Sequence, residues 1–328
     1  MTTSDGTTSV TKQKMDIKTI GNTILKLISR YRTIFVFLVL VIISSSLSPH
    51  FLTTGNITNV LRQASFNGLL SIGLTLVILV KGIDLSAGSV LGVAAMTAGL
   101  LKDQPAFIII GGALLAGALI GWVNGVTIAK LRIEPFVVTL ATLTVGRGIA
   151  LLMTAGYLVV GTTDTIRWLG TGYVLGIPVP VIIMALMFLI AYVVLRWTPY
   201  GRRMYAVGAN EEAARLAGIN VDNHKISAYV ISGVMAAMAG VILVGRLNVS
   251  DPLAGTGYEL DAIAATVIGG TTFDGGKGGI AGTIIGVLIL AMLNNIMNLL
   301  GFSPYMQQVV KGLVLAGAVI MNEYKRRK

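Results

Sequence analysis

Apolar runs of about 20 residues recur along this 328-residue chain, and they constrain its fold more than any other feature. A helix of about 20 apolar residues spans the ~30 Å hydrocarbon core of a bilayer, where only helices and closed barrels satisfy every backbone polar group. Charged residues make up 12% of the chain, about half of the roughly 25% found in soluble domains. The sequence therefore predicts an all-α polytopic membrane protein.

The apolar runs divide into about ten transmembrane segments. We place them at 33–47, 66–80, 85–101, 106–129, 135–153, 177–195, 226–244, 260–268, 280–300 and 305–321. The polar stretch Asn56–Gln63, before the second segment, is expected to lie at the membrane interface. The eighth segment is too short to cross as a regular helix, so we expect it to be broken or re-entrant, and eight spans is the alternative count. The membrane domain then covers 33–322, between a polar segment, 1–32, and a basic tail, 323–328.

The distribution of basic residues orients these segments. With the N-terminus in the cytosol, 19 Lys and Arg fall on the inner side and four on the outer side. This bias follows the positive-inside rule and predicts that both termini are cytosolic. The excess of Lys and Arg on the cytosolic side accounts for the net charge of +11, and we expect no nucleic-acid partner.

A faint internal repeat suggests how the segments are grouped. AGALIG at 116–121 resembles AGTIIG at 281–286, and Pro-Phe at 135–136 resembles Pro-Tyr at 304–305. Five spans in each half is an odd number, so the two five-helix halves would be inverted. Small-residue motifs also recur by chance in such chains, so a chance similarity is the alternative to inverted halves.

The longest interior polar run, 196–225, lies between the sixth and seventh segments. Within it Asn210 is a good N-cap, Glu211 and Glu212 follow in the first turn, and Gly218 offers a stop. The pattern predicts a helix of about two turns exposed to the cytosol. Such a helix suits contact with a soluble partner; a solvated loop that happens to be helical is the alternative.

Several types of chemistry are excluded by residues that are missing. GGTTFDGGKGG at 269–279 resembles a phosphate loop, but Thr271 and Gly278 stand where that motif requires Gly and Ser or Thr. The chain has no cysteine and two histidines. We therefore expect no catalytic site, cofactor or metal, and no nucleotide hydrolysis by this chain itself.

Polar side chains inside apolar segments are candidates for a solute pathway. An intramembrane charge is costly to desolvate, and glycines beside a helix start expose backbone amides to a polar solute. Helix caps, ion pairs and interhelical hydrogen bonds explain the same residues as well, and Glu259 and Asp261 are expected to be caps near the outer surface or to line a vestibule. The pathway candidates are Asp84, Ser86, Asn67, Asn124, Asn294, Asn295, Arg147 and Lys311.

Four motifs carry a resemblance to a known family: GIDLSAGS (82–89), GANEEAARLAGINV (208–221), GTGYELDAIAATVIGGTTFDGGKG (255–278) and LNN (293–295). In this order, over roughly 40–322, the chain resembles the ribose-type sugar permeases, which are membrane subunits of bacterial ATP-binding-cassette importers. The resemblance implies a homodimer in the inner membrane that imports a small sugar, with a ribose-like pentose as first choice. It also implies a cytosolic ATPase on another chain and a periplasmic sugar-binding protein.

In this family a cytosolic coupling helix docks on the ATPase, and the stretch Gly208–Gly218 matches it. The residues that the resemblance assigns to this contact are Gly208, Asn210, Glu211, Ala213, Ala214, Arg215 and Gly218. The binding protein would dock on the outer loops, which include 49–65, 154–176 and 247–259.

A stand-alone ion-coupled carrier or channel is the competing class. It requires a carboxylate or a cation pathway in the middle of a span. The carboxylates fall instead at segment ends, which counts against proton coupling: Asp84, Glu134, Glu259, Asp261 and Asp274.

Overall fold

The structure, a computed structural model, describes the backbone of residues 32–326 and the side chains of residues 33–317 and 320. Residues 1–31 of the predicted N-terminal segment and residues 327–328 of the predicted tail therefore lie outside the described part, whereas the backbone of 323–326 continues the last helix. Thirteen helices fall within it: α2 (Arg32–Leu47), α3 (Thr54–Leu79), α4 (Ala87–Leu100), α5 (Ala106–Lys130), α6 (Pro135–Leu152), α7 (Asp164–Thr171), α8 (Val179–Trp197), α9 (Pro199–Ala209), α10 (Glu211–Leu216), α11 (Val221–Leu247), α12 (Tyr258–Ile268), α13 (Ile280–Leu299) and α14 (Pro304–Arg326).

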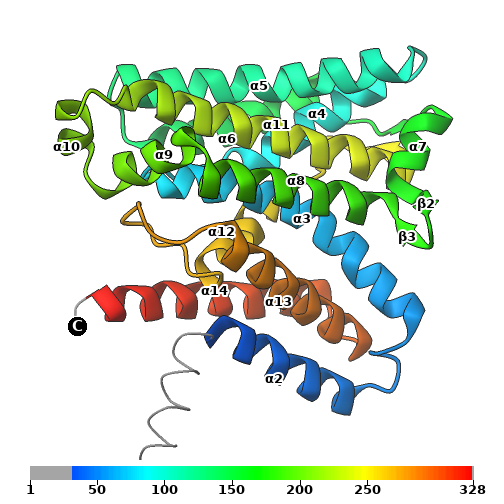
Figure 1. Ribbon diagram of the computed structural model, residues 1–328. Coiled ribbons are helices and arrows are strands. Elements are labelled where there is room, and N and C mark those ends of the chain that lie inside the picture. The colour runs from blue at the N-terminus through cyan, green and yellow to red at the C-terminus, as the bar shows by residue number, and fades with distance from the viewer. Residues whose placement is uncertain (1–31, 327–328) are drawn as a thin grey trace, which may run out of the picture.

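Two long helices, α3 and α11, form the centre of the molecule. They pack on each other, and α4, α5 and α8 pack around them (Figure 1). A second group, α2, α13 and α14, lies along one side of this bundle, and the short α12 lies between the two groups, against both α3 and α13. The buried faces of α3 and α11 supply much of the hydrophobic core.

Six helices in the described part are long and apolar enough to cross a membrane: α3, α5, α6, α8, α11 and α13. Of these, α5, α6 and α8 are the least buried in the single chain, as expected for helices with a surface that meets lipid. Two shorter apolar helices occupy Thr33–Leu47 and Ala87–Leu100. The multi-pass membrane class is thus supported, whereas the count of ten rests on adding α12 and α14.

The second predicted span starts earlier than expected. We assigned Asn56–Gln63 to a separate interfacial stretch, but these residues form the first turns of the 26-residue helix α3. The hydroxyl of Thr53 accepts a hydrogen bond from the Asn56 backbone N–H at 3.4 Å and so caps the helix. Polar residues in these turns find partners on other helices, which the local pattern does not reveal.

The predicted short segment is confirmed, and a second short helix accompanies it. With a rise of 1.5 Å per residue, the 11 residues of α12 cover only about 16 Å and the 14 residues of α4 about 21 Å. Neither spans ~30 Å of hydrocarbon by itself. Most residues of both helices are buried inside the protein, and α4 begins at a buried residue, Ala87.

Two stretches that we interpreted as loops contain further structure. The outer stretch 154–176 holds β1 (Val159–Val160), which pairs with β4 (Val249–Ser250), then α7, and then the hairpin of β2 (Tyr173–Val174) and β3 (Ile177–Pro178). The central stretch 196–225 is mostly helical, because α9 precedes α10. The hydroxyl of Thr198 caps α9 by accepting from the Gly201 N–H at 3.3 Å.

Candidate functional site

The predicted short helix of the central polar run is present as α10. Asn210 is its N-cap, and its Oδ1 accepts a hydrogen bond from the Ala213 N–H at 3.0 Å. Two acids in the first turn and Arg215 in the last turn complement the helix dipole. At the other end, the N–H groups of Gly218 and Ile219 return to carbonyls of α10, which ends the helix.

Two ion pairs hold α10 against the start of α11. Lys225 Nζ lies 2.6 Å from Glu211 Oε1, and Arg215 Nη2 lies 2.6 Å from Asp222 Oδ1. These side chains are partly exposed, so each pair contributes at most about 1 kcal/mol. The two ion pairs therefore contribute little to stability and mainly orient α10 relative to α11.

The seven residues expected on the coupling surface divide into two groups. Gly208 and Ala214 are buried against the chain itself and Glu211 is half-buried, whereas the remaining four are exposed: Asn210, Ala213, Arg215 and Gly218. Sequence reasoning missed Leu216, which is 85% exposed at the end of α10. Its place in the last turn of the predicted helix, two residues before Gly218, is the signal that could have identified it.

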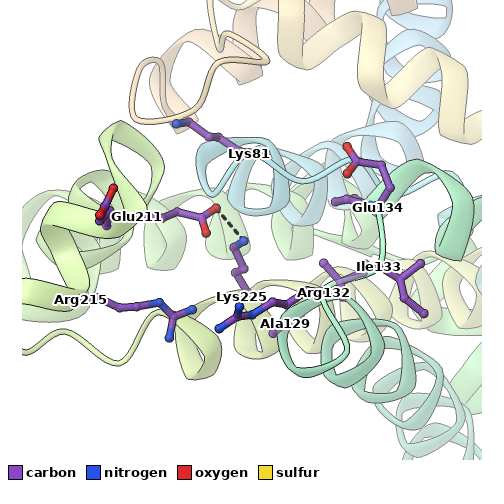
Figure 2. A pocket seen from close by; sticks show the side chains of 11 residues that line it. Lys81, Ala129, Arg132, Ile133, Glu134, Glu211, Arg215 and Lys225 are labelled. Atoms are coloured by element: carbon purple, nitrogen blue, oxygen red, sulfur yellow. Dashed lines mark ion pairs between the residues drawn. The ribbon is translucent and has the colours of Figure 1, made fainter.

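A cleft of 730 Å³ opens beside α10 (Figure 2). Its walls come from α10, the start of α11 and the turn between α5 and α6. Charges of both signs line it, with Lys81, Arg132 and Lys225 on one hand and Glu134 and Glu211 on the other. Such a mixed charged surface suits another protein rather than an apolar ligand.

Helix α9 connects α10 to the membrane body through two tyrosines. Tyr200 OH lies 2.6 Å from Ser227 Oγ on α11, and Tyr205 OH donates to the Gly278 carbonyl at 3.0 Å. Burial raises the pKa of Tyr200, and it also raises the pKa of Tyr205 in spite of the nearby charge of Arg196. Both phenols therefore remain protonated hydrogen-bond donors at neutral pH.

Three pathway candidates join one buried hydrogen-bond network. Asp84 Oδ1 accepts from the Ser86 N–H at 3.0 Å and from Ser86 Oγ at 2.5 Å, and Asp84 Oδ2 accepts from Ser232 Oγ at 2.7 Å. Asn124 donates to Ser86 Oγ at 2.9 Å and accepts from Thr142 at 2.6 Å. This network ties the turn between α3 and α4 to α5, α6 and α11.

The two intramembrane cations also have partners within the chain. Arg147 on α6 donates to the carbonyls of Pro252 and Ala254 at 2.6 and 2.9 Å, and so holds the loop before α12. Lys311 on α14 pairs with Asp261 on α12 at 2.7 Å. Asp261 is therefore an ion-pair partner and not the expected cap, because α12 starts at Gly257 with no side-chain cap.

The asparagine candidates behave differently from one another. Asn295 on α13 and Asn56 on α3 exchange two amide hydrogen bonds, at 2.9 and 2.7 Å. The side-chain oxygens of Asn67 and Asn294 are buried without a hydrogen-bond partner, as is Glu259 Oε2. Unpaired buried acceptors are rare and call for an explanation. In the described part of the chain, no group of three His, Asp or Glu is placed to hold a metal.

A mainly helical body with six helices long and apolar enough to cross a membrane, among the residues that the structure describes, places the protein in the class of multi-pass membrane proteins. The family described as "Branched-chain amino acid transport system / permease component" matches residues 56–319, and the chain belongs to this family. No solved structure matches the chain.

The chain is also similar to named permeases along most of its length. It is 49% identical to the ribose import permease protein of Bacillus subtilis (strain 168), over 88% of this chain and 90% of that protein. It is 47% identical to the ribose import permease protein of Escherichia coli (strain K12), over 90% and 94%. The identity to the corresponding protein of Haemophilus influenzae is 44%, over 89% and 93%.

Proposed function

We propose that this protein is the membrane permease subunit of an ATP-driven importer for a small sugar, with a ribose-like pentose as the solute. The observation that carries the proposal is α10, a capped helix that a permease-family body presents to solvent at the end of the molecule rich in Lys and Arg. The ribose assignment rests on the printed names of the three relatives.

In the proposed mechanism, a separate cytosolic ATP-binding-cassette subunit docks on α10 and the cleft beside it. Closure of the ATPase on ATP moves α10 and, through it, the membrane helices, so that the solute path opens to the other side in turn. A periplasmic sugar-binding protein delivers the solute to the outer elements, which include α7 and the β2–β3 hairpin. The permease contributes no catalytic residue, and the ATP chemistry belongs to the partner.

The membrane arrangement that fits this function has ten spans, both termini in the cytosol and a second copy of the chain. Helix lengths support two inverted halves. The second and seventh segments, α3 and α11, are the longest, and the third and eighth, α4 and α12, are the short ones. Packing follows the same plan, because α5 lies on α11 and α13 lies on α3.

Among the pathway candidates, Asn67 and Asn294 fit a solute path best. Their side-chain oxygens are buried and unpaired, so a passing polyol would supply hydrogen-bond donors that the protein does not. The other six have partners inside the chain: Asp84, Ser86, Asn124, Asn295, Arg147 and Lys311. We assign those six to holding the helices in place.

The test is copurification with the candidate ATPase, followed by sugar uptake into liposomes. Leu216→Asp places a charge on the exposed end of α10, and Leu175→Asp places the same change on the outer hairpin, where Leu175 is 98% exposed. We expect Leu216→Asp to lose ATPase binding and uptake, and Leu175→Asp to retain ATPase binding. Uptake by wild type in liposomes without any ATPase would refute the proposal and establish a stand-alone carrier.

A further inference from the structure

The glycine-rich loop 271–279 packs on α9, the helix that precedes α10 in the chain. The Gly276 N–H donates to the Leu79 carbonyl at the end of α3, at 2.9 Å. Tyr205 on α9 donates to the Gly278 carbonyl at 3.0 Å. We call Leu79, Tyr205, Gly208, Gly276 and Gly278 the glycine joint, because these residues bring three separate parts of the chain into contact.

Gly208 is the point of closest approach in this joint. It is buried on α9, and a Cβ built on it would overlap the Leu79 carbonyl oxygen and lie 2.5 Å from the Gly276 nitrogen. Any side chain at this position would therefore push α9 away from both neighbours. At Gly276 the backbone φ is +65°, in the left-handed region that glycine adopts most readily.

The contacts of the joint run mainly between backbone atoms. Side chains can change rotamer and so absorb a small displacement. Where backbone packs on backbone, the displacement is transmitted to the neighbouring segment, because protein interiors are dense and stiff. The loop also closes on itself, because the Thr272 N–H donates to the Lys277 carbonyl at 3.3 Å. The loop is therefore a compact, hydrogen-bonded turn and not an extended linker.

The ends of the joint connect α10 to the membrane interior. Only Asn210 separates α9 from α10, and its N–H donates to the Ala206 carbonyl of α9 at 3.1 Å, so the two helices are directly joined. The loop follows α12 directly and continues directly into α13. The short helix α12 in turn contacts α3 and carries the ion pair to α14.

We propose that the glycine joint transmits the movement of α10 to α12 and α13, and that Tyr205 and Gly208 are positioning residues for this coupling. The inference rests on the proposed function, because it presupposes an ATPase that moves α10. It gives a role to the glycine-rich loop, which does not have the sequence of a phosphate-binding loop. It also changes the role assigned to Gly208, from a residue that contacts the ATPase to one in the contact between α9 and the membrane body.

The experiment measures sugar transported per ATP hydrolysed by the complete complex in liposomes. Tyr205→Phe removes one hydrogen bond of the joint, and Tyr305→Phe makes the same change at a tyrosine that is 80% exposed at the start of α14, outside the joint. A net hydrogen bond corresponds to about a two- to tenfold effect. We expect Tyr205→Phe and Gly208→Ala to lower the ratio by at least about twofold with the ATPase still bound, and Tyr305→Phe to leave it unchanged.

A disulfide gives an independent measurement that does not depend on the folding of Gly208→Ala. The chain has no cysteine, so Ala209→Cys with Gly276→Cys creates a single pair. A Cβ built on Gly276 lies 3.1 Å from the Ala209 Cβ, somewhat below the ~3.5–4.5 Å of disulfides, and 2.7 Å from the Ala209 nitrogen. The loop must therefore shift slightly to hold the cysteine, and the reduced pair is the reference for the oxidised one. If the joint moves as one unit, the oxidised pair transports as well as the reduced pair. Transport that stops on oxidation and returns on reduction would show that the contact opens, which overturns the proposal.

The results separate this inference from the proposed function. If wild type transports sugar without an ATPase, the proposed function fails and the joint has no movement to transmit. If wild type is coupled to ATP hydrolysis but Tyr205→Phe and Gly208→Ala keep the full ratio, the proposed function stands and the joint alone is refuted.

Discussion

The buried carboxylate of Asp84 provides the sharpest test of whether the polar interior is structural or part of the solute path. Asp84 is 2% exposed and accepts three hydrogen bonds, two from Ser86 and one from Ser232 on α11. None of the three ion pairs among the described residues includes it. We predict that Asp84→Ala destabilises the fold, whereas Asp84→Asn preserves both the fold and transport.

The magnitude follows from the groups left behind. In Asp84→Ala the Ser86 N–H loses its acceptor, and a buried unsatisfied donor costs about 1–3 kcal/mol. The two serine hydroxyls rotate to other acceptors and lose part of about 1 kcal/mol each, while removal of a buried carboxylate gives some of this back. The net loss is about 2–4 kcal/mol. An amide in Asp84→Asn still accepts from Ser86, so its loss is below about 1 kcal/mol.

The assay is thermal unfolding of the purified protein, followed by sugar uptake of the same variants in the complex. The entropy of unfolding is about 2.1 cal/mol/K per residue, so in 328 residues one kcal/mol shifts Tm by about 1.5 °C, and Asp84→Ala should lower Tm by at least about 3 °C. Asp103→Ala, on an exposed turn, is the matched control and should not shift it. If Asp84→Asn keeps its Tm but loses uptake, Asp84 acts on the solute and the structural reasoning is wrong.

Three further changes test other contacts. Asn210→Ala removes the cap of α10 and costs about 1 kcal/mol of local helix stability, which hydrogen exchange of α10 measures. Lys311→Ala leaves Asp261 buried without its partner and lowers Tm by about 3 °C, because a lost buried pair costs up to about 3–5 kcal/mol and this one is partly exposed. Asn295→Ala leaves the Asn56 amide without its partner and costs about 1–3 kcal/mol, seen as a lower Tm.

Each of these three predictions has its own control. Asn220→Ala removes the cap of α11 and should leave exchange in α10 close to wild type; equal exchange in both variants contradicts the first prediction. The double variant Lys311→Ala/Asp261→Ala should regain part of the lost Tm, and no recovery means that the pair is not coupled. Asn298→Ala, on an exposed position of the same helix, should cost less than Asn295→Ala.

Local sequence signals located the elements that depend on local interactions. The cap at Asn210 and the acids after it predicted the start of α10 correctly, because an N-cap bonds only to the next turn. Length alone identified α12 as too short to cross. The same local reasoning separated Asn56–Gln63 from α3 and missed α9. In both elements, polar residues have hydrogen-bond partners far away in the sequence: Asn56 of α3 bonds to Asn295, and Tyr205 of α9 bonds to Gly278.

The class of the protein follows from its amino-acid sequence. Apolar runs, few charges and basic residues gathered on one side are sufficient for a multi-pass helical membrane protein, because the bilayer sets the length and the chemistry of every span. The motifs also determined its family. Only the tertiary structure decided what the polar residues do. Asp84 meets Ser232, 148 residues away, and Asn56 meets Asn295, 239 residues away. Packing brings such pairs together, and no pattern along the chain records it.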